Sequence, residues 1–193
     1  MSKQRENIDS ELASWIARQR VFFVATSPLS AAGHINTSPK GGESFRVLGP
    51  LEVVYQDYTG SGAETAAHLR ENGRIVIMFC AFEGPPQIVR LHGLGQVITP
   101  EHSRFGEFSP LFPVHAGTRA FVHVMLHRVS SSCGYSVPLF DFQGHRDTLE
   151  RWAENQGPEK LKAYRAAKNQ RSIDGLAAFQ SIASTNGRED EGK

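Results

Sequence analysis

The stretch YTGSGAETAAHLRENGRIVIMF, Tyr58–Phe79, joins a glycine-rich turn to a short helix and then to an apolar strand. Ser61 and Glu64 have the spacing of a capping box, in which each side chain accepts a hydrogen bond from the backbone amide of the other residue. Gly73 suits the left-handed conformation that ends many helices. The stretch therefore predicts a helix that starts at Ser61, ends at Gly73 and leads directly into a strand.

The start of this helix has the features of an anion site. Gly60 and Gly62 flank it, so backbone amides are open to a ligand at the positive end of the helix dipole. A Gly-Ser-Gly turn before a helix is also common without any ligand, and both interpretations stay open. Glu64 would repel a phosphate from the same amides. A phosphate here would therefore need a cation from elsewhere in the chain.

The segment HINTSPKGG, residues 34–42, offers such a cation. Proline interrupts strand pairing, so Pro39 predicts that a strand ends at Ser38 and that Lys40 lies on a turn at the rim of a barrel. A lysine in that place is most often a solvated surface charge, and a ligand role for Lys40 is the alternative.

The rest of the chain is mainly β with α decoration. An amphipathic helix with Asp9 or Ser10 as N-cap precedes the strands, and the turn at residues 83–86 predicts a hairpin. Many short strands with turn signals favour a barrel or curled sheet. Seven β-rich runs are separated by Gly, Pro and Ser, at residues 21–27, 33–38, 45–48, 51–57, 74–82, 87–99 and 119–129.

The C-terminal third is helical by composition. Three helices are expected, at residues 146–157, 158–170 and 172–184, with Gly157 and Pro158 between the first two. They either cap the barrel or reach over a second subunit. We expect one domain over 1–184, with the barrel at about 21–130, a helical extension at about 141–184 and a disordered tail at 185–193.

Composition narrows the function classes. The 193 residues carry a net charge of +1, with no basic field that would favour nucleic acid or an anionic membrane as partner. Two cysteines are too few for a disulfide framework, and the start has no apolar run typical of a signal peptide, so a cytoplasmic location is expected. The longest apolar run, residues 75–82, is too short to cross a bilayer.

The sequence gives little support for a metal site, a reactive cysteine or a hydrolase. His123 and His127 lie on a predicted strand without further ligands, so no metal site is expected. Cys80 is predicted to lie in the core. Cys133 is either an exposed reactive thiol or, the commoner case, a small buried one. No nucleophile elbow indicates a hydrolase.

Together, the 58–79 block and INTSPKGG resemble the FMN-binding split barrels that include pyridoxamine 5′-phosphate oxidase. The oxidase has the same order of Tyr-Thr, short loop, helix and apolar strand, and its relatives have a Ser-Pro-basic-Gly segment. The resemblance covers about Leu12–Val129. The chain departs from the oxidase at Ala63, Glu64 and Thr65, where the oxidase loop supplies Ser, Arg and Lys to the phosphate. It also lacks the C-terminal signature that reads the pyridoxal substrate, so vitamin B6 oxidation is not assigned.

The resemblance implies a split β-barrel of about six to seven antiparallel strands, a homodimer, and FMN in a groove shared between subunits. The implied function is an oxidoreductase acting on an unknown small molecule. One alternative is a non-catalytic flavin, deazaflavin or haem binding or stress-response protein, and another is a scaffold whose site Glu64 closes. The implied cofactor-binding residues are Ser38, Pro39, Lys40, Tyr58, Thr59, Gly60, Ser61, Gly62, Thr65, Gln87 and Arg90.

Overall fold

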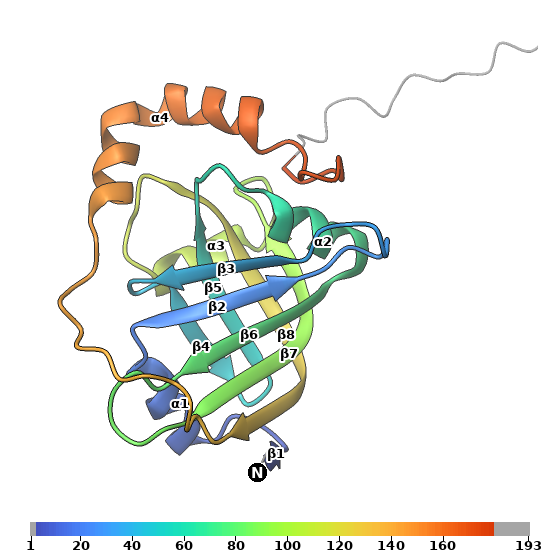
Figure 1. Cartoon of the computed structure of the whole chain (residues 1–193). Helices are drawn as coiled ribbons and strands as arrows, with labels where there is room; N and C mark the ends of the chain where they lie inside the picture. The colour runs from blue at the N-terminus through green and yellow to red at the C-terminus, as the bar shows by residue number, and fades with distance from the viewer. Residues whose placement is uncertain (1–2, 180–193) are drawn as a thin grey trace, which may run out of the picture.

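The computed structural model describes residues 3–179 and shows one curled, antiparallel sheet, the split barrel of the predicted fold class (Figure 1). The strands pair in the order β3-β2-β6-β7-β8-β5-β4, and β1 pairs with β8. Each of the seven predicted runs overlaps one of the strands β2–β8, whereas β1 was not predicted. The strands are β1 Lys3–Arg5, β2 Val21–Thr26, β3 Asn36–Gly41, β4 Phe45–Gly49, β5 Glu52–Tyr58, β6 Arg74–Cys80, β7 Ile88–Ile98 and β8 Thr118–Ser132.

The core lies inside the curl, because side chains alternate between the two faces of each strand. Phe22, Tyr55 and Phe79 are almost fully buried there, and the Phe22 ring centroid is 5.7 Å from each of the other two. Figure 1 shows α1 at one end of the barrel and α2 and α4 toward the other. The helices are α1 Ser10–Ala17, α2 Glu64–Asn72, α3 Phe105–Phe108, the 3-10 helix η1 Ser109–Leu111 and α4 Thr148–Lys168.

Helix α2 begins later than predicted. Its N-cap is Ala63, no side chain caps it, and the Glu64 carboxylate accepts from the Ala63 N–H at 3.0 Å, so the capping box from Ser61 is wrong. The turn before it is contacted instead by Arg119, which donates to the Gly62 carbonyl at 2.9 Å. The predicted end is confirmed, since Gly73 has φ 72° and caps the last turn.

Strand β3 runs further than predicted. Pro39 pairs with Phe23 and Lys40 with Phe22, so the expected strand end at Ser38 and the turn position of Lys40 are wrong. β3 stands at one end of the sheet path and pairs only with β2, so the missing N–H of Pro39 breaks no second ladder. Because Lys40 is held in a strand, the backbone fixes the direction of its side chain.

The C-terminal segment forms one bent helix and a turn. The expected break in α4 is confirmed at Gly157, which has φ 69° and ψ 170° before Pro158. The rings of Trp152 and Tyr164 meet across the bend with centroids 5.2 Å apart. The prediction of a third helix is wrong for residues 172–179, because the chain makes a turn there at Gly175, whose φ is 77°. The remainder of that helix and the tail at 185–193 lie outside the described residues.

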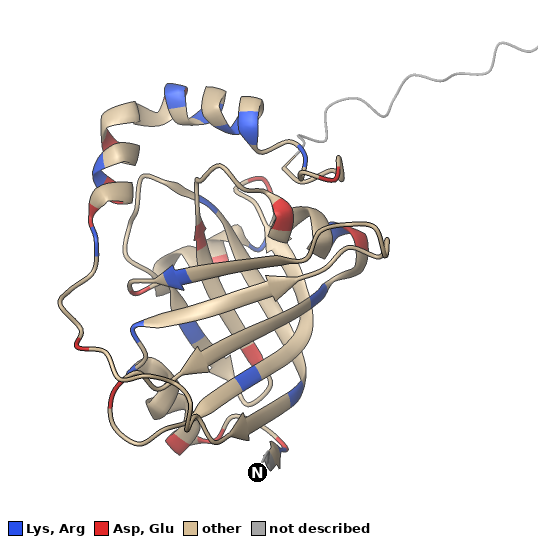
Figure 2. Ribbon diagram, in the orientation of Figure 1, with Lys and Arg blue, Asp and Glu red and all other residues tan. Residues whose placement is uncertain are grey.

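Charged residues are mixed along the ribbon, with basic positions at the end of β3 and on the second half of α4 (Figure 2). Cys80 is buried as predicted, but Cys133 is exposed, so the buried interpretation of that thiol is wrong. Cys133 directly follows the end of β8, where the chain leaves the sheet. Within residues 3–179, no helix is long and apolar enough to span a bilayer.

Candidate functional site

The turn that follows β5 is fixed by buried hydrogen bonds. Thr59 is fully buried, and both its amide and its hydroxyl donate to the Gly117 carbonyl, at 2.7 and 2.8 Å. These two bonds tie the start of the turn to the residue that precedes β8.

A buried ionic group lies beside this turn. The Asp57 carboxylate contacts the Lys40 Nζ at 2.9 Å and the Arg119 Nε at 2.7 Å, and we call these three residues the Asp57 cluster. Burial raises the pKa of Asp57, but the two cations outweigh burial and lower that pKa from 3.8 to about 2. Two positive charges facing one negative charge leave the cluster with a surplus of one positive charge.

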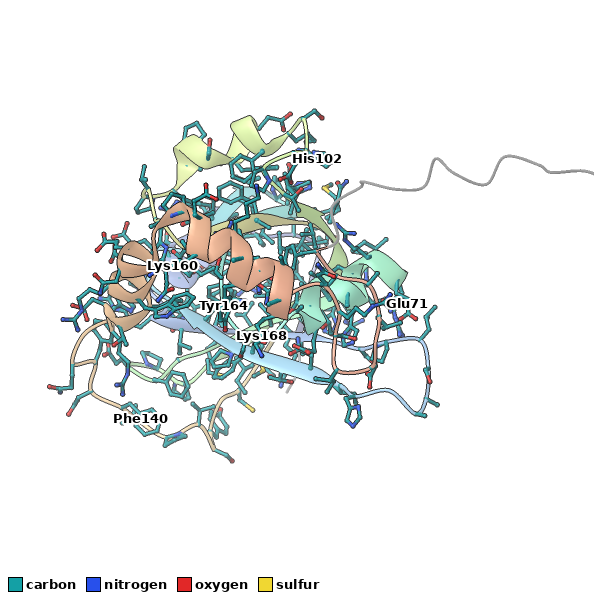
Figure 3. All side chains as sticks on the ribbon, turned by 90° about the horizontal axis from the view of Figure 1, so that it is seen from above. Glu71, His102, Phe140, Lys160, Tyr164 and Lys168 are labelled. Carbon is teal, nitrogen blue, oxygen red and sulfur yellow. The ribbon has the colours of Figure 1, made fainter. Side chains whose placement is uncertain are left out.

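Helix α4 brings two further polar side chains to the turn. Arg165 donates to the Thr59 hydroxyl at 2.8 Å and to the Thr118 carbonyl at 3.1 Å. Asn169 donates to the Gly60 carbonyl at 2.8 Å and accepts from Arg119 at 3.0 Å. Burial, and then the nearby Arg119 charge, lower the pKa of Arg165. Figure 3 shows α4 crossing over the end of the barrel, with Lys160, Tyr164 and Lys168 labelled along it.

A small cavity of about 170 Å³, cavity A, opens between β3, this turn and α2. Lys40 and Arg119 supply positive charge to its wall, and Glu64 supplies the one carboxylate. The Glu64 oxygens accept from the backbone amides of Ala63 and Ile173, which offsets part of that negative charge. Cavity A is lined by Asn36, Ser38, Lys40, Tyr58, Gly60, Gly62, Glu64, Thr65 and Arg119.

A larger cavity of about 750 Å³, cavity B, adjoins cavity A and shares Lys40, Tyr58 and Gly60 with it. In its wall the His115 ring stacks on Tyr58, with centroids 4.1 Å apart and planes at 25°. The Gly117 N–H donates to His115 Nδ1 at 2.9 Å, and burial lowers the pKa of this histidine. His115 is therefore held neutral with its proton on Nε2. Pro39, Gln56 and Thr59 also line cavity B.

Two comparisons of sequence decide the family. Residues 8–133 match the family model described as pyridoxamine 5′-phosphate oxidase. The pyridoxamine 5′-phosphate oxidase family protein ustO of Aspergillus flavus is 39% identical over 195 residues, which cover 91% of this chain and 77% of ustO. This chain belongs to the pyridoxamine 5′-phosphate oxidase family.

Solved structures agree with that family at the level of the fold. A HupZ variant of group A Streptococcus is 23% identical, with a TM-score of 0.50 over 65% of this chain and 99% of HupZ. A pyridoxamine 5′-phosphate oxidase-like protein of Lactobacillus delbrueckii is 15% identical, with a TM-score of 0.50 over 66% of this chain and 98% of its own. At these identities the likeness shows the split-barrel fold and nothing further.

The family match at residues 8–133 includes β3, the turn and β8, whereas Arg165 and Asn169 lie beyond it. In this member of the pyridoxamine 5′-phosphate oxidase family, α4 also brings side chains to the site. Sequence reasoning missed both residues, and it missed Arg119, Gln56 and His115 as well. The sequence offered no local signal for Arg119, because alternation places it on the strand face opposite the apolar Ala120 and Val122.

The structure brings most of the predicted site residues together. Eight of them line cavity A or cavity B: Ser38, Pro39, Lys40, Tyr58, Thr59, Gly60, Gly62 and Thr65. Ser61 lies in the same turn but lines neither cavity. Gln87 lines a third cavity, and Arg90 donates to the Ser132 hydroxyl at 3.2 Å on β8, away from Lys40. Within residues 3–179, no group of three or more His, Cys, Asp or Glu side chains is arranged to hold a metal.

Proposed function

We propose that this protein binds FMN and acts as an oxidoreductase on a small molecule. The observation that carries the proposal is the Asp57 cluster, which presents Lys40 and Arg119 to a cavity whose other groups are hydroxyls, an amide, glycine backbone and the Glu64 carboxylate. Lysine and arginine are the usual partners of a phosphate, and the Glu64 carboxylate is already engaged by two backbone amides. In the proposal, the FMN phosphate occupies cavity A, and Lys40 and Arg119 replace the loop cations that the sequence lacks.

Cavity B would take the ribityl chain and the ring system. Its volume of about 750 Å³ lies within the range of about 300 to 1,000 Å³ that is common for ligand pockets. Because Lys40, Tyr58 and Gly60 line both cavities, one elongated molecule can extend from cavity A into cavity B. His115 offers an Nε2–H donor from the wall of cavity B, and Pro39 offers an apolar surface.

A bound flavin itself supplies the redox chemistry, accepting and passing on a hydride or electrons. The residues of this chain would bind and orient it, hold the phosphate and keep water from the site. A protein that only binds and orients the flavin needs no acid–base residues, which fits a site built from one ionic cluster, hydroxyls and stacked rings. The proposal also includes the homodimer that the family resemblance implies. Arg90 lines neither cavity A nor cavity B, so it has no assigned part in binding flavin within one copy of the chain.

The test compares FMN with riboflavin, which has the same ring but no phosphate. The Lys40→Met variant keeps most of the side-chain length and loses the charge, so it should bind FMN about 10- to 100-fold more weakly, as expected for one charge-assisted hydrogen bond. Its riboflavin affinity should stay within about twofold. Affinities are measured by quenching of flavin fluorescence, with Lys160→Met as the matched control, since Lys160 is exposed on α4.

Equal loss of FMN and riboflavin binding in Lys40→Met would refute the phosphate role of Lys40. Turnover is tested separately, by following flavin reduction with NADH or NADPH and reoxidation by a quinone. A tightly bound flavin that none of these reagents reduces or reoxidises would refute the oxidoreductase part and leave the binding part standing.

A further inference from the structure

A third cavity of about 760 Å³, cavity C, lies beside the start of β2, where Arg20 and Val21 line it. Its walls are the end of α1, the turn between β6 and β7, and residues 134–147, which we call the strap. The strap leads from the end of β8 to the start of α4. The aromatic residues that line cavity C are Trp15, Phe82, Phe140 and Phe142.

The strap holds two aromatic rings in the wall without burying them. The Phe140 amide donates to the Phe82 carbonyl at 2.9 Å, and the Phe142 amide donates to the Glu83 carboxylate at 3.3 Å. Despite these anchors, Phe140 is 59% exposed and Phe142 is 41% exposed. Aromatic rings fixed beside a cavity and left in water favour an apolar molecule that covers them.

The charges of cavity C indicate an acidic group on that molecule. The Arg20 guanidinium lies 4.9 Å from the centroid of the Phe142 ring, and neither the Arg20 nor the Arg18 side chain makes a hydrogen bond or ion pair within residues 3–179. Of the two carboxylates in the wall, Glu83 already accepts from the strap, and Asp141 is the other. The wall therefore carries two positive and two negative charges, and the preference for an anion is local. The Arg20 guanidinium lies over the Phe142 ring and holds no ion pair within residues 3–179, so it is well placed for a carboxylate or sulfonate.

Cavity C is continuous with cavity B, because Arg20, Val21 and Gly144 line both. We propose that cavity C binds a planar aromatic acid, with the rings of Phe82 and Phe142 against its aromatic part and Arg20 on its acidic group. The assignment of this compound as the substrate rests on the proposed function, since it places the compound next to the flavin in cavity B. The binding site itself stands on the geometry of cavity C alone.

Two fluorescent probes test the site on the purified full chain. 8-Anilinonaphthalene-1-sulfonate is an aromatic acid with a planar naphthalene ring, and N-phenyl-1-naphthylamine has the same rings without the sulfonate. The parent protein should bind the sulfonate saturably. Arg20→Gln should weaken the binding of the sulfonate about tenfold and change the affinity for the uncharged probe by less than about twofold. Phe142→Leu keeps an apolar side chain and removes the ring, so it should weaken both probes by about three- to tenfold.

The controls separate this inference from the proposed function. Arg70→Gln, in an exposed arginine of α2, should leave both probes unchanged. FMN affinity of Arg20→Gln and Phe142→Leu is measured in parallel, and thermal unfolding shows that each variant folds. If FMN fails to bind the parent but the probe pattern holds, the proposed function falls and the aromatic-acid site stands. If FMN binds and the sulfonate does not saturate, or if Arg20→Gln weakens both probes equally, the inference is overturned.

Discussion

Replacing Asp57 with asparagine removes the carboxylate that Lys40 and Arg119 share and leaves both cations in a buried site. The Asp57 side chain is only 5% exposed, so solvent screens these contacts weakly. Removal of one partner from a buried ion pair costs about 3 to 5 kcal/mol, and we expect Asp57→Asn to lose about that much unfolding free energy at pH 7. FMN should restore part of this loss, because its phosphate would supply the missing negative charge.

The pH dependence gives the sharper test. The pKa of Asp57 is about 2 in the folded protein against 3.8 for the free side chain, so its stabilisation is complete above the higher value and is lost as pH falls toward the lower one. One pKa unit is worth about 1.4 kcal/mol, so the difference corresponds to about 2.5 kcal/mol in total. Between pH 6 and pH 2 the parent should lose about 2 kcal/mol more unfolding free energy than Asp57→Asn.

Urea unfolding at several pH values measures both effects, and the difference between parent and variant cancels the other titrating groups. Asp147→Asn is the matched control, because Asp147 is 62% exposed in a surface pair with Arg151 and should contribute less than about 0.5 kcal/mol. If parent and Asp57→Asn lose stability in parallel from pH 6 to pH 2, the pKa of Asp57 is not held low and the cluster is not the ionic site described.

Two further predictions concern the elements around the site. Gly73→Ala places a side chain at φ 72° and should destabilise the protein by about 1 kcal/mol in urea unfolding, with FMN affinity unchanged; no loss would mean that the left-handed cap is not required. Arg165→Gln removes the charged donor to the Thr59 hydroxyl and should lower the affinity for FMN about three- to tenfold, measured by fluorescence titration. Lys162→Gln, at an exposed position of the same helix, should leave that affinity unchanged. Equal affinities of these two α4 variants for FMN would exclude a role for α4 in the site.

Local signals in the sequence were sufficient for the fold. β-rich runs separated by Gly, Pro and Ser predicted strands β2–β8, and the turn at residues 83–86 predicted the β6–β7 hairpin that the structure shows. These features depend on residues close together in the chain. The position of Gly73 was predicted for the same reason, since a glycine after a helical run signals a left-handed end.

The errors arise where distant residues override a local signal. The Ser61 capping box was wrong because Arg119 holds the Gly62 carbonyl in the folded chain. The strand was not ended by Pro39 because β3 has a single neighbour, which the sequence does not state. The third C-terminal helix was wrong over 172–179 because Asp174 instead accepts from the His34 amide at 2.8 Å, across 140 residues of sequence.

The functional site shows the same difference between local signals, which the sequence reveals, and contacts between distant residues, which it does not. The turn and Lys40 could be found because their motif is contiguous, but Arg119 meets Asp57 only after β5 pairs with β8, and Arg165 arrives on a separate helix. A phosphate site needs cations within hydrogen-bonding distance, and their positions in the sequence do not matter. The ends of β3, β8 and α4 converge on one turn in this fold, so a cation lost from the turn can be replaced from any of the three. The absence of basic residues between Tyr58 and Glu64 therefore does not argue against a phosphate site in this chain, and the Lys40 and Arg165 variants test the replacement at two of its three sources.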